Sequence, residues 1–137
     1  MFILAKNKKA LFKSLILYIC ITVFIAIFGF VYEQFSHNVH TLYMYLAWLW
    51  VLGFGVIPYL LLYLLPIKIM PGFITECIYN LGVAFLTARS IYCGVIIIYG
   101  TTGEQMIMVY SILASICLIA GSLLFVFGLL MEKEEKE

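Results

Sequence analysis

The chain has 137 residues, of which 66% are hydrophobic and 11% are charged, and its mean hydropathy is +1.15. Soluble domains are roughly 45–50% apolar and about 25% charged, so a soluble chain of this length has too small an interior for this composition. The net charge of +1 argues against a nucleic-acid partner, which needs a basic patch. We therefore expect an integral membrane protein, a single domain over residues 1–137 whose surroundings are the lipid bilayer.

Four apolar stretches are each long enough to cross a bilayer core about 30 Å thick, which takes about 20 helical residues. They cover approximately residues 10–32, 43–65, 73–99 and 106–131. The connections between them are short, and short connections join neighbouring antiparallel helices. The sequence thus predicts an all-α fold with four transmembrane helices in an up-down antiparallel bundle.

The seven lysines indicate how this bundle is oriented. They lie before or in the first turn of the first expected helix, in the second connection, or after the fourth helix: Lys6, Lys8, Lys9, Lys13, Lys68, Lys133 and Lys136. The first and third connections contain neither Lys nor Arg, and basic residues in short flanks favour the cytoplasmic side. We expect both termini in the cytoplasm (N-in/C-in) and a location in the plasma membrane.

Arg89 lies within the third expected helix, about ten residues and hence roughly 15 Å below its outer end. An arginine at that depth costs a few kcal/mol and marks a candidate functional residue. Two structural roles are the alternatives: the guanidinium caps backbone carbonyls, or it reaches toward the outer headgroups.

A second set of polar and small residues recurs at helical spacing on the opposite face of the same helix. These residues are Glu76, Asn80, Thr87 and Gly94. Such residues are used for helix contacts in membranes, and they also line solute paths. Both interpretations are open at this point.

The second expected helix is interrupted, because Gly53-Phe54-Gly55 is followed by Pro58. Proline has no N–H, so the carbonyl of Phe54 loses its helical partner and needs another inside the membrane. Phe54 and Arg89 have similar expected depths, and we predict that Arg89 approaches this glycine turn. A broken helix beside a mid-membrane charge is typical of transporter binding sites, and an ordinary proline kink is the alternative.

The fourth expected helix carries small residues along one face: Ser111, Ala114, Ser115, Gly121 and Ser122. A face of this kind lets helices approach closely, either within the bundle or in a dimer.

The first outer connection contains three residues of the types that bind metals. If this connection is helical, Glu33, His37 and His40 share one face, and Glu104 in the other outer connection is a further ligand. The alternative is a solvated loop with interfacial histidines. The four cysteines form no C-x-x-C pair, and paired histidines for a haem are absent from the expected helices, so no cofactor is predicted. The sequence has no catalytic constellation either, which leaves an enzymatic function unsupported.

Two short segments resemble known sequences: Tyr32-Glu33-Gln34-Phe35-Ser36-His37 and Ile98-Tyr99-Gly100-Thr101-Thr102. They are similar to segments of small uncharacterised four-span membrane proteins of low-GC Gram-positive bacteria. The resemblance implies the same four-span layout and no particular activity.

Three functions fit these features. In the first, the chain is a small transport-type protein that acts as a homo-oligomer, and Arg89, the broken second helix and the Glu76–Asn80–Thr87 stripe line a path for an anionic or neutral solute. In the second, it is an accessory or assembly subunit of a larger membrane complex, with Arg89 pairing with a partner. The third is a metal or redox protein at the outer face. No residue of the sequence distinguishes the transport function from the accessory function.

Overall fold

The computed structural model describes residues 8–36, 40–64 and 72–134, and these residues are almost entirely helical. Three long helices are uninterrupted: α1 (Lys8–Gln34), α5 (Phe73–Tyr99) and α6 (Glu104–Glu134). Between α1 and α5 the described residues form four short helices: α2 (Leu42–Tyr45), α3 (Ala47–Val51), the π-helix η1 (Leu52–Val56) and α4 (Ile57–Leu64). No strand occurs in these ranges, so the expected all-α fold class is confirmed for them.

The described part of the chain has four helical segments that are long and apolar enough to cross a membrane. They cover residues 9–34, 47–64, 73–99 and 104–131, close to the expected stretches. Large apolar side chains point outward from all of them; for example, Phe24 is 66% exposed and Phe127 is 54% exposed. A surface of this kind is stable against lipid and not against water, as expected of a multi-pass membrane protein.

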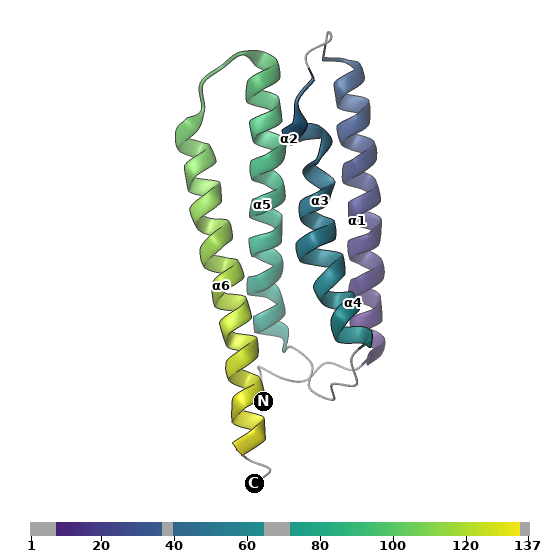
Figure 1. The fold of residues 1–137 in the computed structure, drawn as a ribbon, viewed down its shortest axis with the longest axis vertical. Coiled ribbons are helices and arrows are strands. Elements are labelled where there is room, and N and C mark those ends of the chain that lie inside the picture. The colour runs from purple at the N-terminus through teal and green to yellow at the C-terminus, as the bar shows by residue number, and fades with distance from the viewer. Residues whose placement is uncertain (1–7, 37–39, 65–71, 135–137) are drawn as a thin grey trace.

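The helices lie side by side, and each long segment packs on the next (Figure 1). The second segment, from α2 to α4, packs against α1 on one flank and, mainly through α2 and α3, against α5 on the other. Among the described elements, α6 makes extensive contacts with α5 alone. Helix α6 therefore lies outside the group that α1, the second segment and α5 form.

Glycines allow α6 to lie close to α5. A Cβ atom at Gly121 would lie 2.9 Å from Cα of Tyr79, and one at Gly82 would lie 2.8 Å from the backbone nitrogen of Leu118. Ala114 is buried as well, whereas Ser115 and Ser122 are exposed. Part of the small-residue face of α6 is thus used within the chain, for the close approach that small residues permit.

The second segment is broken at Leu46, between α2 and α3, and this break was not predicted from the sequence. Met44 is inserted here between two glycines: a Cβ at Gly29 of α1 would lie 2.8 Å from the Met44 carbonyl oxygen, and one at Gly94 of α5 would lie 2.7 Å from Met44 Cβ. Ser90 Oγ donates a hydrogen bond of 2.7 Å to the carbonyl of Tyr43. Ser90 thereby provides the partner that a carbonyl at a helix break needs inside a membrane.

The interruption expected before Pro58 takes the form of the π-helix η1. Its backbone bonds span five residues, since the Ile57 N–H donates to the carbonyl of Leu52. Pro58 then lies in the first turn of α4. The wider turn relieves the clash that a proline ring makes with the carbonyl four residues before it, and π-turns of this kind often mark functional sites.

Candidate functional site

Five polar side chains of α1, α4 and α5 meet inside the group of helices, and we call them the polar cluster. Tyr18 donates a hydrogen bond of 2.7 Å to Oδ1 of Asn80, and Tyr59 donates one of 2.9 Å to the same atom. Ser14 Oγ donates to Oε1 of Glu76 at 2.9 Å. Both pairs between α1 and α5 have the same sequence separation of 62 residues, so these two helices run parallel and in register.

The π-helix positions one member of the polar cluster. Gly55 is buried, and a Cβ atom at this position would overlap the ring of Tyr18. The ring therefore lies directly on the backbone of the interrupted segment. Tyr18 also packs on Tyr59, with ring centroids 5.2 Å apart. The glycine turn predicted from the sequence thus contacts Tyr18, and Tyr18 in turn packs on Tyr59, the second tyrosine that donates to Asn80.

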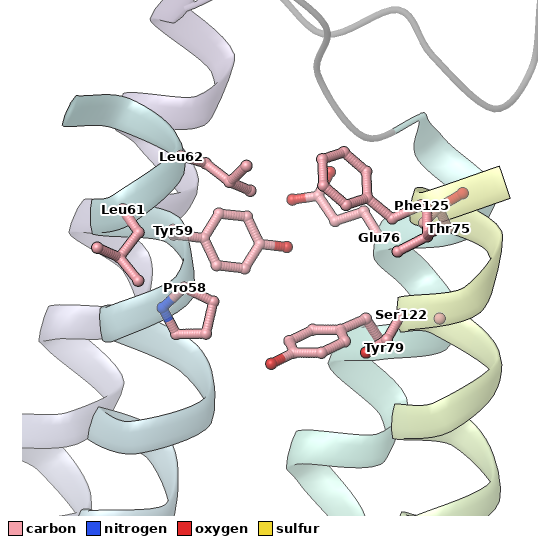
Figure 2. Close-up of a pocket in the computed structure, with 11 residues that line it drawn as sticks. Pro58, Tyr59, Leu61, Leu62, Thr75, Glu76, Tyr79, Ser122 and Phe125 are labelled. Atoms are coloured by element: carbon pink, nitrogen blue, oxygen red, sulfur yellow. The ribbon is translucent and has the colours of Figure 1, made fainter. Parts of the chain in front are cut away.

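A cavity of about 320 Å³ lies between α4, α5 and α6, and we call it the α4–α6 cavity. Its lining includes Pro58, Tyr59, Glu76, Tyr79, Ser122 and Phe125. Figure 2 shows Tyr59 extending from α4 toward α5, with the carboxylate of Glu76 facing it from α5. In the same wall, the hydroxyl of Thr75 is buried and has no hydrogen-bond partner among the described residues.

A second cavity of about 480 Å³ lies between α1, α3 and α5. Its lining includes Tyr18, Asn80, Val83 and Thr87, and Thr87 Oγ1 donates to the Val83 carbonyl of its own helix at 2.9 Å. Glu76 and Tyr59 therefore line one cavity, and Asn80 lines the other. The hydrogen bond from Tyr59 to Asn80 connects the walls of the two cavities. Gly94, the last residue of the predicted stripe, packs instead against α2.

Arg89 lies elsewhere on α5 and lines neither of these two cavities. Phe85 and Tyr92, one turn below and above it on the same face, both contact the ring of Tyr110 on α6, with centroids 6.2 and 5.9 Å apart. The Nε atom of Arg89 is buried and has no hydrogen-bond partner among the described residues. No described contact joins Arg89 to the turn at Gly53, and their proximity stays a prediction.

The connection between α1 and α2, for which a metal site was considered, is described only in part, since His37 lies outside the described residues. Glu33 accepts a hydrogen bond of 3.1 Å from the Thr41 backbone N–H, and its other oxygen lies 3.6 Å from Nδ1 of His40. Within the described ranges no three His, Cys, Asp or Glu residues are grouped so as to hold a metal ion. The contacts of Glu33 fix the start of α2, where Thr41 is the N-cap.

The structure thus brings together Glu76, Asn80, Gly55 and Pro58 of the predicted site, and it adds Ser14, Tyr18 and Tyr59, which the sequence analysis missed. A signal for two of them was present in the first expected helix. Ser14, Tyr18 and Thr22 recur there at intervals of four residues, which places three hydroxyls on one face of an otherwise apolar helix.

No protein-family model, no curated protein and no solved structure matches this chain. A function must therefore be argued from the chemistry of the site and not from the fold.

Proposed function

We propose that the chain is a small transport-type protein of the plasma membrane, which acts as an oligomer and carries a small solute past the polar cluster. The observation that supports this function best is the position of the cluster, between two cavities and against a π-turn of the interrupted segment. Ionisable and polar groups inside a membrane are costly and mark substrate paths, and broken helices are typical of transporter binding sites.

In this proposal the four membrane segments form an up-down antiparallel arrangement with both termini in the cytoplasm. The parallel register of α1 and α5 supports it, because alternate helices of an up-down arrangement run in the same direction. Glu76 and Asn80 follow the start of α5 closely. With lysines on the cytoplasmic side, the polar cluster lies in the cytoplasmic half of the membrane.

The polar cluster is the gate between the two cavities. Asn80 Oδ1 accepts from both tyrosines, and a solute that offers its own hydrogen-bond donor competes for that oxygen. Release of Tyr59 needs α4 to move relative to α5, and the π-turn next to Pro58 is the hinge for this movement. Four helices enclose little volume, so a continuous path requires a second copy of the chain.

Arg89 favours a second candidate function, that of an accessory subunit in a larger membrane complex. A buried guanidinium nitrogen without a partner in the described part of the chain is a costly feature. A carboxylate on another membrane protein would relieve that cost. In this case Arg89, and not the polar cluster, is the functional residue.

Purification from the native membrane in mild detergent separates the two functions. The mass and composition of the complex are determined first, and the preparation is then reconstituted into liposomes with tetraethylammonium, erythritol or benzenesulfonate as radiolabelled tracers. A homo-oligomer that admits at least one tracer above the level of protein-free liposomes supports transport. A stable complex with a second protein, and no tracer uptake, would replace transport by the accessory function.

A further inference from the structure

The amide nitrogen of Asn80 is an unused hydrogen-bond donor within the membrane segments. Tyr18 and Tyr59 both donate to the oxygen of this amide, and no hydrogen bond within the described ranges uses its nitrogen. An asparagine amide carries two N–H donors besides its oxygen. Asn80 follows Phe73, the first residue of α5, by roughly 10 Å at 1.5 Å per residue. At that depth lipid tails offer no acceptor, so a ligand that brings one supplies the missing partner.

This nitrogen is accessible from a cavity. Asn80 lines the second cavity, the space of about 480 Å³ between α1, α3 and α5. In the described part of the chain, the fully enclosed side-chain atoms without a partner are Thr75 Oγ1 and Arg89 Nε. The nitrogen of Asn80 lacks a partner as well but is not enclosed in this way. The cavity is large enough for an organic ligand, since such cavities measure about 300–1,000 Å³.

The other polar groups of the second cavity have no hydrogen to offer a ligand. The hydroxyl of Tyr18 donates to Asn80, and that of Thr87 donates to the carbonyl of Val83. All remaining lining residues are Leu, Ile, Val or Ala, and none of the described lining residues is charged. A charged ligand would lose its hydration here without gaining a counter-charge. The lining therefore favours a neutral, mostly apolar molecule that accepts one hydrogen bond.

The second cavity can be reached from the bilayer. Leu17 and Ile21 of α1 line it, and they are also 59% and 38% exposed on the outside of the helices. A molecule dissolved in the lipid can therefore enter between α1 and α5 without first crossing an aqueous phase.

We propose that the second cavity binds a neutral, mostly apolar molecule with a carbonyl group, and that this carbonyl accepts a hydrogen bond from the amide nitrogen of Asn80. The proposal rests on the proposed transport function, because it names the substrate class of that site. It selects the neutral class from the anionic and neutral solutes expected from the sequence. Binding through the nitrogen leaves both tyrosine bonds to the oxygen in place, so the ligand can occupy the cavity while the gate is closed.

Equilibrium binding to the purified protein in detergent tests this proposal without any transport step. The probe is radiolabelled benzophenone, and 1,1-diphenylethylene is a ligand of nearly the same size and shape with a methylene group in place of the carbonyl oxygen. After correction for partition into protein-free micelles, we expect the wild-type protein to bind the ketone about fivefold more tightly or better. Equal affinities would overturn the proposal, because a lipid chain or any other apolar molecule would then fill the cavity as well.

Benzophenone also reports its own position, because irradiation attaches it to C–H groups close to its carbonyl carbon. We expect attachment to residues of α1 or α5 that line the second cavity, such as Leu17, Val83 or Ile91. Peptide mapping by mass spectrometry identifies them. Attachment confined to residues outside this lining would overturn the proposed site, and neither of these two measurements needs a variant.

A variant then tests the donor. Asn80→Leu keeps the approximate size of the side chain and removes the amide, and we expect the ketone to bind it no more tightly than the alkene. Gln105→Leu, which removes the amide of an exposed residue at the start of α6, is the matched control and should retain the preference for the ketone. A folded Asn80→Leu protein that still prefers the ketone would refute the proposal. If this variant does not fold, the affinities and attachment sites of the wild type decide.

Binding and transport can fail separately. If a tracer enters liposomes but the protein does not distinguish the ketone from the alkene, the ligand class is wrong and the transport function stands. If the ketone binds with the expected dependence on Asn80 but no tracer enters, the cavity is a binding site in a protein that is not a transporter.

Discussion

Tyr18 of α1 and Asn80 of α5 are joined by a hydrogen bond of 2.7 Å at the point where Gly55 of the π-helix lies against the tyrosine ring. Tyr59 donates to the same oxygen of Asn80. Three membrane segments therefore meet at one amide group. This relationship links the helix break, which is visible in the sequence, to the polar cluster, which is not.

The first prediction concerns the shared acceptor. Tyr18→Phe or Tyr59→Phe alone leaves Asn80 Oδ1 with one donor, and each should lower the free energy of unfolding by about 0.5–1.5 kcal/mol. The double variant leaves no tyrosine donor and should cost more than the sum of the two, because an unsatisfied buried acceptor carries a penalty of about 1–3 kcal/mol. Unfolding of the purified protein in mixed micelles measures these values. Tyr45→Phe is the control, and a strictly additive double variant would contradict the shared-acceptor arrangement.

The two glycines of the π-helix should respond differently to alanine. A Cβ at Gly55 overlaps the Tyr18 ring, so Gly55→Ala should destabilise the protein by about 1–3 kcal/mol. A Cβ at Gly53 meets no atom within 4 Å, so Gly53→Ala should be neutral or stabilising by up to about 1 kcal/mol. The same unfolding assay compares them. Equal effects at the two positions would mean that Tyr18 does not pack on Gly55.

The break at Leu46 is tested through Ser90. Ser90 is 1% exposed, and its hydroxyl is the partner of the Tyr43 carbonyl, so Ser90→Ala should cost about 1–3 kcal/mol of unfolding free energy. Ser115→Ala removes an exposed hydroxyl that bonds only to its own helix, at the carbonyl of Ser111, and should change stability by less than about 0.5 kcal/mol. If both substitutions have the same small effect, Ser90 does not stabilise the break.

The helices were predictable because length and hydropathy determine where a chain can cross a membrane. The third stretch, expected over residues 73–99, has the bounds of α5. Pro58 and its glycines marked the interruption before α4, because proline acts through its own backbone. The break at Leu46 was missed, since it depends on Met44 fitting between Gly29 and Gly94, two residues of other helices.

The candidate site was predictable in part. Glu76 and Asn80 could be predicted as site residues, because they are polar residues within an apolar helix. Tyr18 and Tyr59 count as hydrophobic residues in composition, and their hydroxyls acquire a role only when α1 and α4 face Asn80. Arg89 was predicted as a site residue because a charge inside a membrane helix is costly, but it lines neither of the two cavities at the polar cluster.

The proposed orientation makes a prediction of its own. With both termini in the cytoplasm, Thr102 in the connection before α6 faces outward. Cysteine introduced by Thr102→Cys should react with a membrane-impermeant maleimide in intact cells, above the labelling of the wild-type protein with its four native cysteines. Labelling of position 102 only after the membrane is opened would reverse the topology.

The central claim, that a solute passes the polar cluster, is tested most directly by tracer uptake into proteoliposomes of wild-type protein, Glu76→Gln and Glu104→Gln. We predict that the wild type and Glu104→Gln admit at least one of the tracers tetraethylammonium, erythritol and benzenesulfonate well above protein-free liposomes, and that Glu76→Gln reduces this uptake at least tenfold. The claim would be contradicted if none of the three tracers entered the wild-type vesicles, or if Glu76→Gln transported as the wild type does.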